Sequence, residues 1–213
     1  MMEFAGRLRK LLLFSGVLAS LLAVGTDALA GMLWDGYSFT FQSISELSAI
    51  GAPTRPLVFP LNLIYDALLV AFGLGIWRSS RKRAMRVIAG LLFGNAIISF
   101  AVVVFFPMYL DEAVSVIHLV LMAMNVIFLQ MLTIVLGAVA FRNWFRFYSI
   151  GTLLAFLVLT IFGLFVAPQI IPGPPQSGLE ERVMGYDYLL WQAMLAIVIL
   201  REKSDNRLNF YQF

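Results

Sequence analysis

Long apolar runs separated by short polar segments dominate the chain. Six runs are long enough to cross the roughly 30 Å hydrocarbon core of a bilayer as helices rising 1.5 Å per residue. They cover residues 11–33, 57–77, 87–108, 114–141, 147–167 and 183–200. Because a backbone in lipid must satisfy its own hydrogen bonds, continuous apolar runs favour helices, whereas a barrel would show short alternating strands. The pattern predicts an all-α fold, a polytopic bundle of six transmembrane helices forming a single domain over residues 1–213.

Composition strengthens this picture and excludes several kinds of chemistry. Of the 213 residues, 61% are hydrophobic and 13% are charged, whereas about a quarter of residues are charged in a typical soluble domain. The absence of cysteine excludes disulfides, thiolate metal sites and cysteine nucleophiles. The sequence also contains no phosphate-binding glycine loop, HExxH zinc motif or nucleophile elbow. We therefore expect no cofactor and no metal site.

The basic residues indicate how the chain is oriented. The net charge of +3 comes from small clusters between apolar runs, a distribution that argues against binding to nucleic acid. If both termini are cytoplasmic, thirteen of the fifteen basic residues lie on the cytoplasmic side. These are Arg7, Arg9, Lys10, Arg78, Arg81, Lys82, Arg83, Arg86, Arg142, Arg146, Arg201, Lys203 and Arg207. The bias predicts a multi-pass protein of the cytoplasmic membrane with its N- and C-termini in the cytoplasm.

The first apolar run has a second interpretation. A basic start followed by Ala28-Leu29-Ala30 also fits a cleavable secretory signal. The apolar run continues past this site to Leu33, which favours a retained first helix.

Two long connections on the predicted outer side carry helix-start signals. Ser43 to Glu46 fits a capping box, and Gly51 and Pro53 would end the short helix that it opens. We expect this turn to pack over the mouth of the bundle. The other connection is proline-rich from Pro168 to Pro175, and Ser177 to Glu180 then repeats the capping-box pattern.

Ionisable residues inside membrane spans are costly and are therefore the main candidates for function. The chain has four, Asp27, Asp66, His118 and Asp187, all within about 13 Å of the predicted outer boundary. Helical spacing places them on inward-facing stripes. Asp66 shares a stripe with Asn62 and Gly73, and His118 shares one with Met122, Asn125 and Thr133. The sequence thus predicts an outward-facing polar pocket with Glu46 and Arg182 near its rim. Its candidate ligand-binding residues are Asp27, Glu46, Asn62, Asp66, His118, Asn125, Arg182 and Asp187.

Purely structural roles remain open for these residues. Asp27, His118 and Asp187 also suit hydrogen-bonded positions near helix ends, and a bond to Asn95 or Asn125 would satisfy Asp66. The three aspartates have no Lys or Arg at their own depth, so mutual repulsion would favour protonation of the deepest, Asp66.

Two segments resemble a known family. They are Ser43-Ile44-Ser45-Glu46-Leu47-Ser48-Ala49, followed by Gly51-Ala52-Pro53 and Asn62, and Gly178-Leu179-Glu180-Glu181-Arg182, which runs on to Tyr188 and Trp191. On these motifs the chain resembles the prokaryotic membrane proteins grouped as domain of unknown function 998. The resemblance implies a compact bundle of about six helices and no assigned activity.

Three classes of function fit the sequence. The first is an integral membrane protein without enzymatic activity that binds, senses or moves a small molecule or lipid in the polar pocket. The second is an intramembrane lipid hydrolase, with Asp66 or Asp27 as general base or metal ligand and His118 as its acid-base partner. The third is an accessory subunit of a larger membrane complex. The expected partners are the lipid bilayer, a lipid or small-molecule ligand, and another membrane protein or a second copy of the chain.

Overall fold

The computed structural model describes residues 2–111, 113, 116–162 and 177–202, and regular structure in this part of the chain is helical. The elements are α1 (Met2–Leu33), the 3₁₀ helix η1 (Ser45–Ser48), α2 (Arg55–Ser79), α3 (Arg83–Phe105), α4 (Val116–Met124), the π-helix η2 (Asn125–Gln130), α5 (Met131–Ala140), α6 (Trp144–Ile161) and α8 (Ser177–Glu202). One isolated bridge joins Ile50 to Tyr109.

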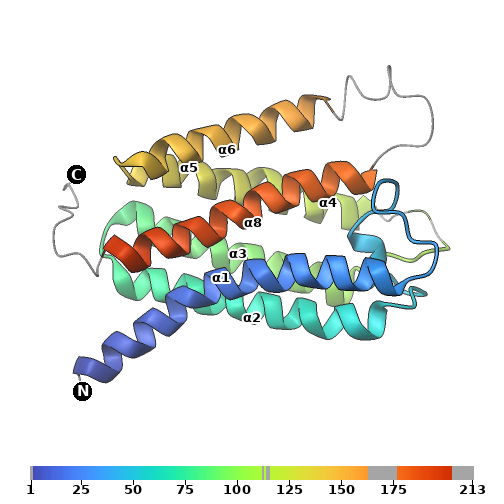
Figure 1. Ribbon diagram of the computed structural model, residues 1–213, viewed down its shortest axis with the longest axis horizontal. Helices are drawn as coiled ribbons and strands as arrows, with labels where there is room; N and C mark the ends of the chain where they lie inside the picture. The colour runs from blue at the N-terminus through green and yellow to red at the C-terminus, as the bar shows by residue number, and fades with distance from the viewer. Residues whose placement is uncertain (1, 112, 114–115, 163–176, 203–213) are drawn as a thin grey trace.

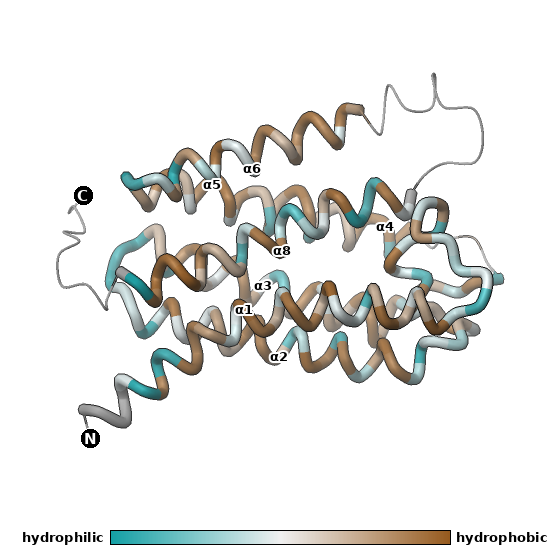
Figure 2. Tube along the Cα trace, viewed as in Figure 1, coloured by the Kyte–Doolittle hydropathy of each residue, from teal (hydrophilic) through white to brown (hydrophobic). Residues whose placement is uncertain are grey.

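The described residues form six helical stretches that are long and apolar enough to cross a membrane, with α4, η2 and α5 joined into one. The predicted all-α bundle of six spans is thereby confirmed. Figure 2 shows apolar residues along the helices and polar ones concentrated toward their ends. The last helix begins at Ser177, as the second capping-box pattern predicted, six residues before the apolar run that starts at 183. Glu181 and Arg182 therefore lie inside the helix. The predicted proline-rich segment, the end of the fifth span and the side chain of Ser177 lie outside the described residues.

The spans form a closed ring (Figure 1). Around it, α1 packs on α2, α2 on α3, α3 on α5, α5 on α6, α6 on α8, and α8 on α1. Some of these contacts depend on small residues. A Cβ added to Gly75 of α2 would lie 2.8 Å from the backbone of Leu12 in α1, so the two helices approach closely.

A buried aromatic cluster holds the opposite side of the ring together. The rings of Tyr188 and Trp191 in α8 stack with centroids 6.2 Å apart, and both residues belong to the main apolar core. The Trp191 Nε1 donates a 2.9 Å hydrogen bond to Ser149 Oγ of α6. This core occupies the end of the bundle away from η1 and leaves the η1 end for the more polar groups.

Residues 34–54, between α1 and α2, fold over one end of the ring and are called the cap below (Figure 1). The predicted capping box is present. Ser43 N donates to Glu46 Oε1 at 3.0 Å, and Glu46 N donates to Ser43 Oγ at 3.3 Å. Gly51 has a φ of +96°, a conformation that glycine adopts without strain, and the chain turns there into α2. The short helix and its end are therefore where the sequence predicted them.

Candidate functional site

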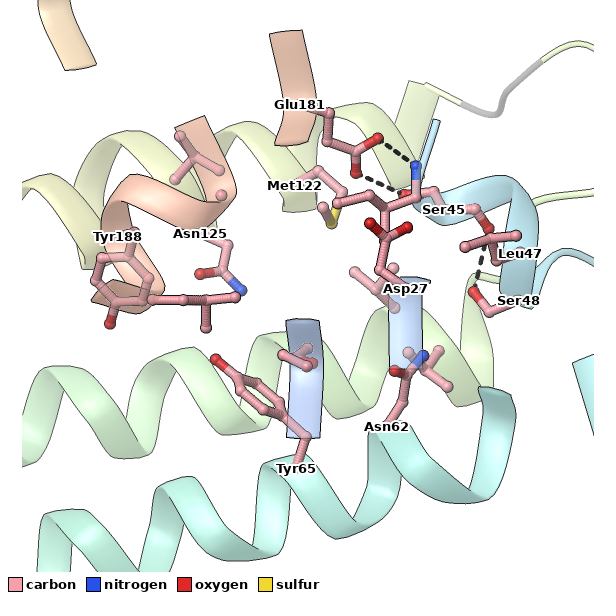
Figure 3. Close-up of a pocket in the computed structure, with 18 of the residues that line it drawn as sticks. Asp27, Ser45, Leu47, Ser48, Asn62, Tyr65, Met122, Asn125, Glu181 and Tyr188 are labelled. Carbon is pink, nitrogen blue, oxygen red and sulfur yellow. Dashed lines mark hydrogen bonds between the residues drawn. The ribbon is translucent and has the colours of Figure 1, made fainter. Parts of the chain in front are cut away.

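A cavity of about 270 Å³ lies inside the ring beneath the cap. Its wall is formed by the cap and by residues of α1, α2, α3, α4, η2, α6 and α8 (Figure 3). Most of the wall is apolar, and polar side chains are distributed among these elements. They are Thr26, Asp27, Ser45, Ser48, Asn62, Tyr65, Asn95, Ser99, His118, Asn125, Gln130, Glu181, Tyr186 and Tyr188. A mostly apolar wall with a few convergent polar groups is typical of small-molecule sites.

The structure brings half of the predicted pocket residues to this cavity. Asp27, Asn62, His118 and Asn125 line it. The other four candidates, Glu46, Asp66, Arg182 and Asp187, lie outside its wall.

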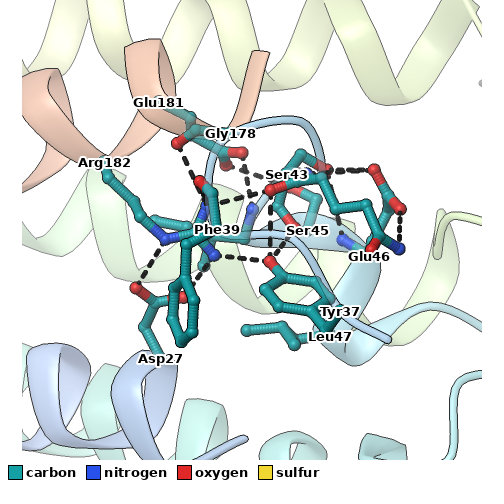
Figure 4. A network of polar contacts seen from close by, with 12 residues as sticks. Asp27, Tyr37, Phe39, Ser43, Ser45, Glu46, Leu47, Gly178, Glu181 and Arg182 are labelled. Atoms are coloured by element: carbon teal, nitrogen blue, oxygen red, sulfur yellow. Dashed lines mark hydrogen bonds and ion pairs between the residues drawn. The ribbon is translucent and has the colours of Figure 1, made fainter. Parts of the chain in front are cut away.

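Asp27 of α1 is paired with Arg182 of α8 (Figure 4). Arg182 Nε donates to Asp27 Oδ2 at 3.0 Å, and Arg182 Nη2 donates to Oδ1 at 2.8 Å. Tyr186, one turn further along α8, also donates its hydroxyl to Oδ2. Asp27 and Arg182 are only 2% and 6% exposed. The expectation that Arg182 lies at the rim, and that no basic residue shares the depth of Asp27, is therefore wrong, because the longer α8 carries Arg182 inward.

The same guanidinium also holds the cap. Its Nη1 donates to the carbonyl oxygens of Phe39 at 2.8 Å and Gln42 at 2.9 Å, and its Nη2 donates to the hydroxyl of Tyr37. Burial raises the pKa of Tyr37 to about 12, although the nearby Arg182 opposes the shift. The phenol therefore stays protonated, and its hydroxyl donates a 2.8 Å hydrogen bond to the carbonyl oxygen of Ser43. Arg182 thus ties α1, α8 and the cap together.

Glu181, the residue before Arg182, fastens the cap at a second place. Its carboxylate accepts from the backbone N–H of Ile44 at 2.8 Å and from the hydroxyl of Ser45 at 3.3 Å. Glu46 stays within the cap, where it completes the capping box and accepts from Gln42 Nε2 at 3.0 Å. Two adjacent charged residues of α8 therefore position the wall segment contributed by the cap.

Asp66 and Asp187 are directed elsewhere. Asp66 is 5% exposed, and neither of its carboxyl oxygens has a hydrogen-bond partner in the described part of the chain. Ser99 of α3 lies close enough to the Asp66 carboxyl group to interact with it. The expected bond from Asp66 to Asn95 or Asn125 is not formed, since Asn95 pairs with the Tyr188 hydroxyl. The Asp187 Oδ2 is likewise buried without a partner among the described residues.

Three of the four residues of the stripe predicted on the fourth span face the cavity, and the fourth, Thr133, does not line it. His118, Met122 and Asn125 all contribute to its wall. His118 Nδ1 lies 2.9 Å from the carbonyl oxygen of Phe106, which fixes the start of α4 to the end of α3. The helix then widens into η2, whose i to i+5 hydrogen bonding brings Gln130 onto the same face as Asn125.

Sequence reasoning placed the sixth span at the pocket through Arg182 and Asp187, but it missed the residues of α8 that line the cavity. Glu181, Met184, Gly185, Tyr188 and Leu189 line it from one face of this helix. Their spacing of three and four residues is the signal that would have identified this face of the helix. Gly185 lies at its centre, and a Cβ added there would meet open space.

The described residues contain no group of three or more His, Asp or Glu side chains placed to hold a metal ion.

Comparison with known proteins gives a family and no activity. The family model for proteins of unknown function (DUF998) matches residues 17–198, which run from within α1 to within α8 and include the whole cavity wall. This match confirms the resemblance noted in the Ser43 and Gly178 segments. No curated protein and no solved structure matches the chain.

Proposed function

Because the chain belongs to the DUF998 family of proteins of unknown function, we propose its function from its geometry: it is a multi-pass membrane protein that binds a small molecule or lipid in the cavity beneath the cap. In this account it senses or moves the ligand and does not convert it.

One observation carries the proposal. The cavity wall presents polar groups that the protein leaves unused. Asn62 lines the cavity, and its side chain has no hydrogen-bond partner in the described part of the chain. Polar groups inside a membrane protein are costly when unpaired, so a cavity that exposes several of them favours an occupant with hydrogen-bonding groups. Asn125 and Gln130 share only a long 3.5 Å contact and add to this set.

The geometry gives the hydrolase alternative less support. That reading needs His118 to act with Asp27 or Asp66. Both oxygens of Asp27 already accept hydrogen bonds from Arg182, and Asp66 lies outside the cavity wall. A general base needs a lone pair directed at the reacting group. Binding without chemistry requires neither residue to be free.

The orientation is part of the proposal. The clusters of basic residues around Arg9, Arg81 and Arg142 lie at helix ends away from the cap. The positive-inside rule then puts the termini in the cytoplasm and the cap outside. The cavity would face the outer half of the cytoplasmic membrane.

Native mass spectrometry of gently solubilised protein tests binding. Wild type is compared with Gly185→Phe, which directs a ring into the open space of the cavity, and with Gly151→Phe. Gly151 is the matched control, since it is also a helical glycine with open space around it but sits on the exposed face of α6. We expect a bound mass in stoichiometric amount in wild type and in Gly151→Phe, and its loss in Gly185→Phe. A wild type without bound mass, or retention by Gly185→Phe, would contradict the proposal.

A further inference from the structure

The cap is fastened to the bundle on two sides. On the α8 side, besides the contacts of Glu181 and Arg182, Leu179 N donates to the Thr40 carbonyl at 3.0 Å. The backbone there is so close that a Cβ on Gly178 would lie 2.1 Å from the Gln42 carbonyl oxygen. On the other side, Ile50 pairs with the connection after α3, where Ile50 N donates to the Met108 carbonyl at 2.8 Å. A ligand that entered through the cap would have to break charge-assisted hydrogen bonds, which are among the strongest in proteins.

On another side of the cavity, the described parts of α4 and α6 pack little on each other. Figure 1 shows α6 separating from the α5–η2–α4 stretch toward the cap end. α5 packs on α6, whereas α4 packs on α3. Most side chains of α4 are exposed, including Leu119 at 55% and Val120 at 50%, and so is Val158 of α6 at 63%. Among the described residues, the apolar side chains that line the cavity on this side are Met122 of α4, Val126 of η2 and Phe156 of α6.

The charges around the cavity restrict the polar part of a ligand. Among the described residues of its wall there is no Lys or Arg. Arg182 lies behind Asp27, and its guanidinium donates to Asp27, Tyr37 and cap carbonyls. A phosphate in the cavity would meet the carboxylates of Asp27 and Glu181 without a cation to pair with, and like charges placed together cost several kcal/mol. A cationic group would find both carboxylates already occupied by protein donors.

Resting on the proposed function, we infer that the ligand is an uncharged lipid with a hydroxyl-bearing polar end, which reaches the cavity sideways from the bilayer between α4 and α6. Its hydroxyl and ester groups would bond to neutral polar side chains of the wall such as Asn62 and Asn125. Its acyl chains would leave through the apolar flank at Met122 and Phe156.

Photolabelling with a matched pair of lipids tests this inference. The probes are a diacylglycerol and a phosphatidic acid with identical acyl chains, each carrying a diazirine on one chain, mixed into nanodiscs that contain the purified protein. The two probes differ only in the phosphate. Gly185→Phe and Gly151→Phe serve as cavity-filled and outward-facing variants. Glu46→Ala loosens the cap without removing a side chain that lines the cavity.

We expect the diacylglycerol to label peptides around Met122 and Phe156 at least tenfold more than the phosphatidic acid. Labelling should be lost in Gly185→Phe, retained in Gly151→Phe, and unchanged in rate in Glu46→Ala. Equal or stronger labelling by the phosphatidic acid would overturn the assignment of an uncharged lipid, and faster labelling of Glu46→Ala would overturn sideways access. Labelling that persists in Gly185→Phe would mean that the lipid lies outside the cavity. If wild type carries a bound mass in native spectra and neither probe labels the flank, the lipid inference fails and the proposed binding function stands.

Discussion

Arg182 of α8 holds Asp27 of α1 through two parallel hydrogen bonds, of 3.0 Å from Nε and 2.8 Å from Nη2. The pair joins the first and last spans, and its two residues are 155 positions apart in sequence. The pair is buried, and the Nη1 of Arg182 donates hydrogen bonds to cap carbonyls. The pair is therefore the point at which the closure of the ring and the position of the cap depend on each other.

Removing one charge of this pair should destabilise the protein strongly. Asp27→Asn leaves the buried guanidinium of Arg182 without its counter-charge, at an expected cost of about 3 to 5 kcal/mol. The double variant Asp27→Asn/Arg182→Met should cost less than the sum of the two single variants, because it leaves no unpaired buried charge. The free energy of unfolding in mixed detergent micelles measures both effects. Asp35→Asn is the control, because Asp35 is an exposed carboxylate of the cap. Equal stability of Asp27→Asn and Asp35→Asn would show that the pair contributes little.

The close approach of α1 and α2 predicts opposite outcomes for two glycines. Gly75→Ala places a Cβ 2.8 Å from the Leu12 backbone and 2.9 Å from that of Leu13, so the helices must move apart, at about 1 to 3 kcal/mol. Gly90→Ala on α3 meets no atom within 4 Å and should be neutral or stabilising by up to about 1 kcal/mol, because alanine favours a helix. Thermal unfolding compares them. The account of helix packing fails if Gly90→Ala is the less stable variant.

Loosening the cap should expose the residues beneath it. Because the chain has no cysteine, Ser48→Cys provides a single label site on the cavity side of η1. Glu181→Gln removes the charged acceptor for Ile44 N and Ser45 Oγ. A hydrogen bond to a charged group contributes about 1.5 to 3 kcal/mol, so labelling by a water-soluble maleimide should accelerate about tenfold or more. Glu180→Gln, the neighbouring carboxylate, should leave the rate unchanged, and equal rates in all three proteins would mean that Glu181 does not fasten the cap.

The orientation can be tested with the same cysteine-free background. Asp35→Cys lies on the cap and Ser80→Cys lies in the connection between α2 and α3. In intact cells, a membrane-impermeant maleimide should label Asp35→Cys and should reach Ser80→Cys only after the membrane is opened. The reverse pattern would place the cap in the cytoplasm and contradict the outward-facing cavity.

Local sequence signals predicted much of the fold. The six spans follow from apolar length alone, since a lipid-spanning segment has few structural options. The capping box at Ser43 and Glu46 formed as expected because its two hydrogen bonds lie within four residues. The stripe of His118, Met122 and Asn125 faces the cavity because the α-helical period fixes it.

Other parts of the site depend on tertiary structure that no local pattern encodes. Arg182 was placed at the rim because it precedes the apolar run that begins at 183, whereas the cap folds around its guanidinium and buries it. Asn62 and Asp66 share a predicted stripe, yet four residues turn a helix by about 40° beyond a full circle. That offset leaves Asn62 in the cavity wall and Asp66 behind it. The π-helix from Asn125 to Gln130 has no signature in its apolar sequence.

The central claim is that another molecule occupies the cavity beneath the cap. An experimental density map of the protein purified with its own membrane lipids tests this most directly. The account predicts continuous density that does not belong to the chain, bounded by Asn62, Asn125 and Gly185 and extending outward past Met122 between α4 and α6. A map in which the surrounding side chains close together and fill this space in the native lipids would contradict it.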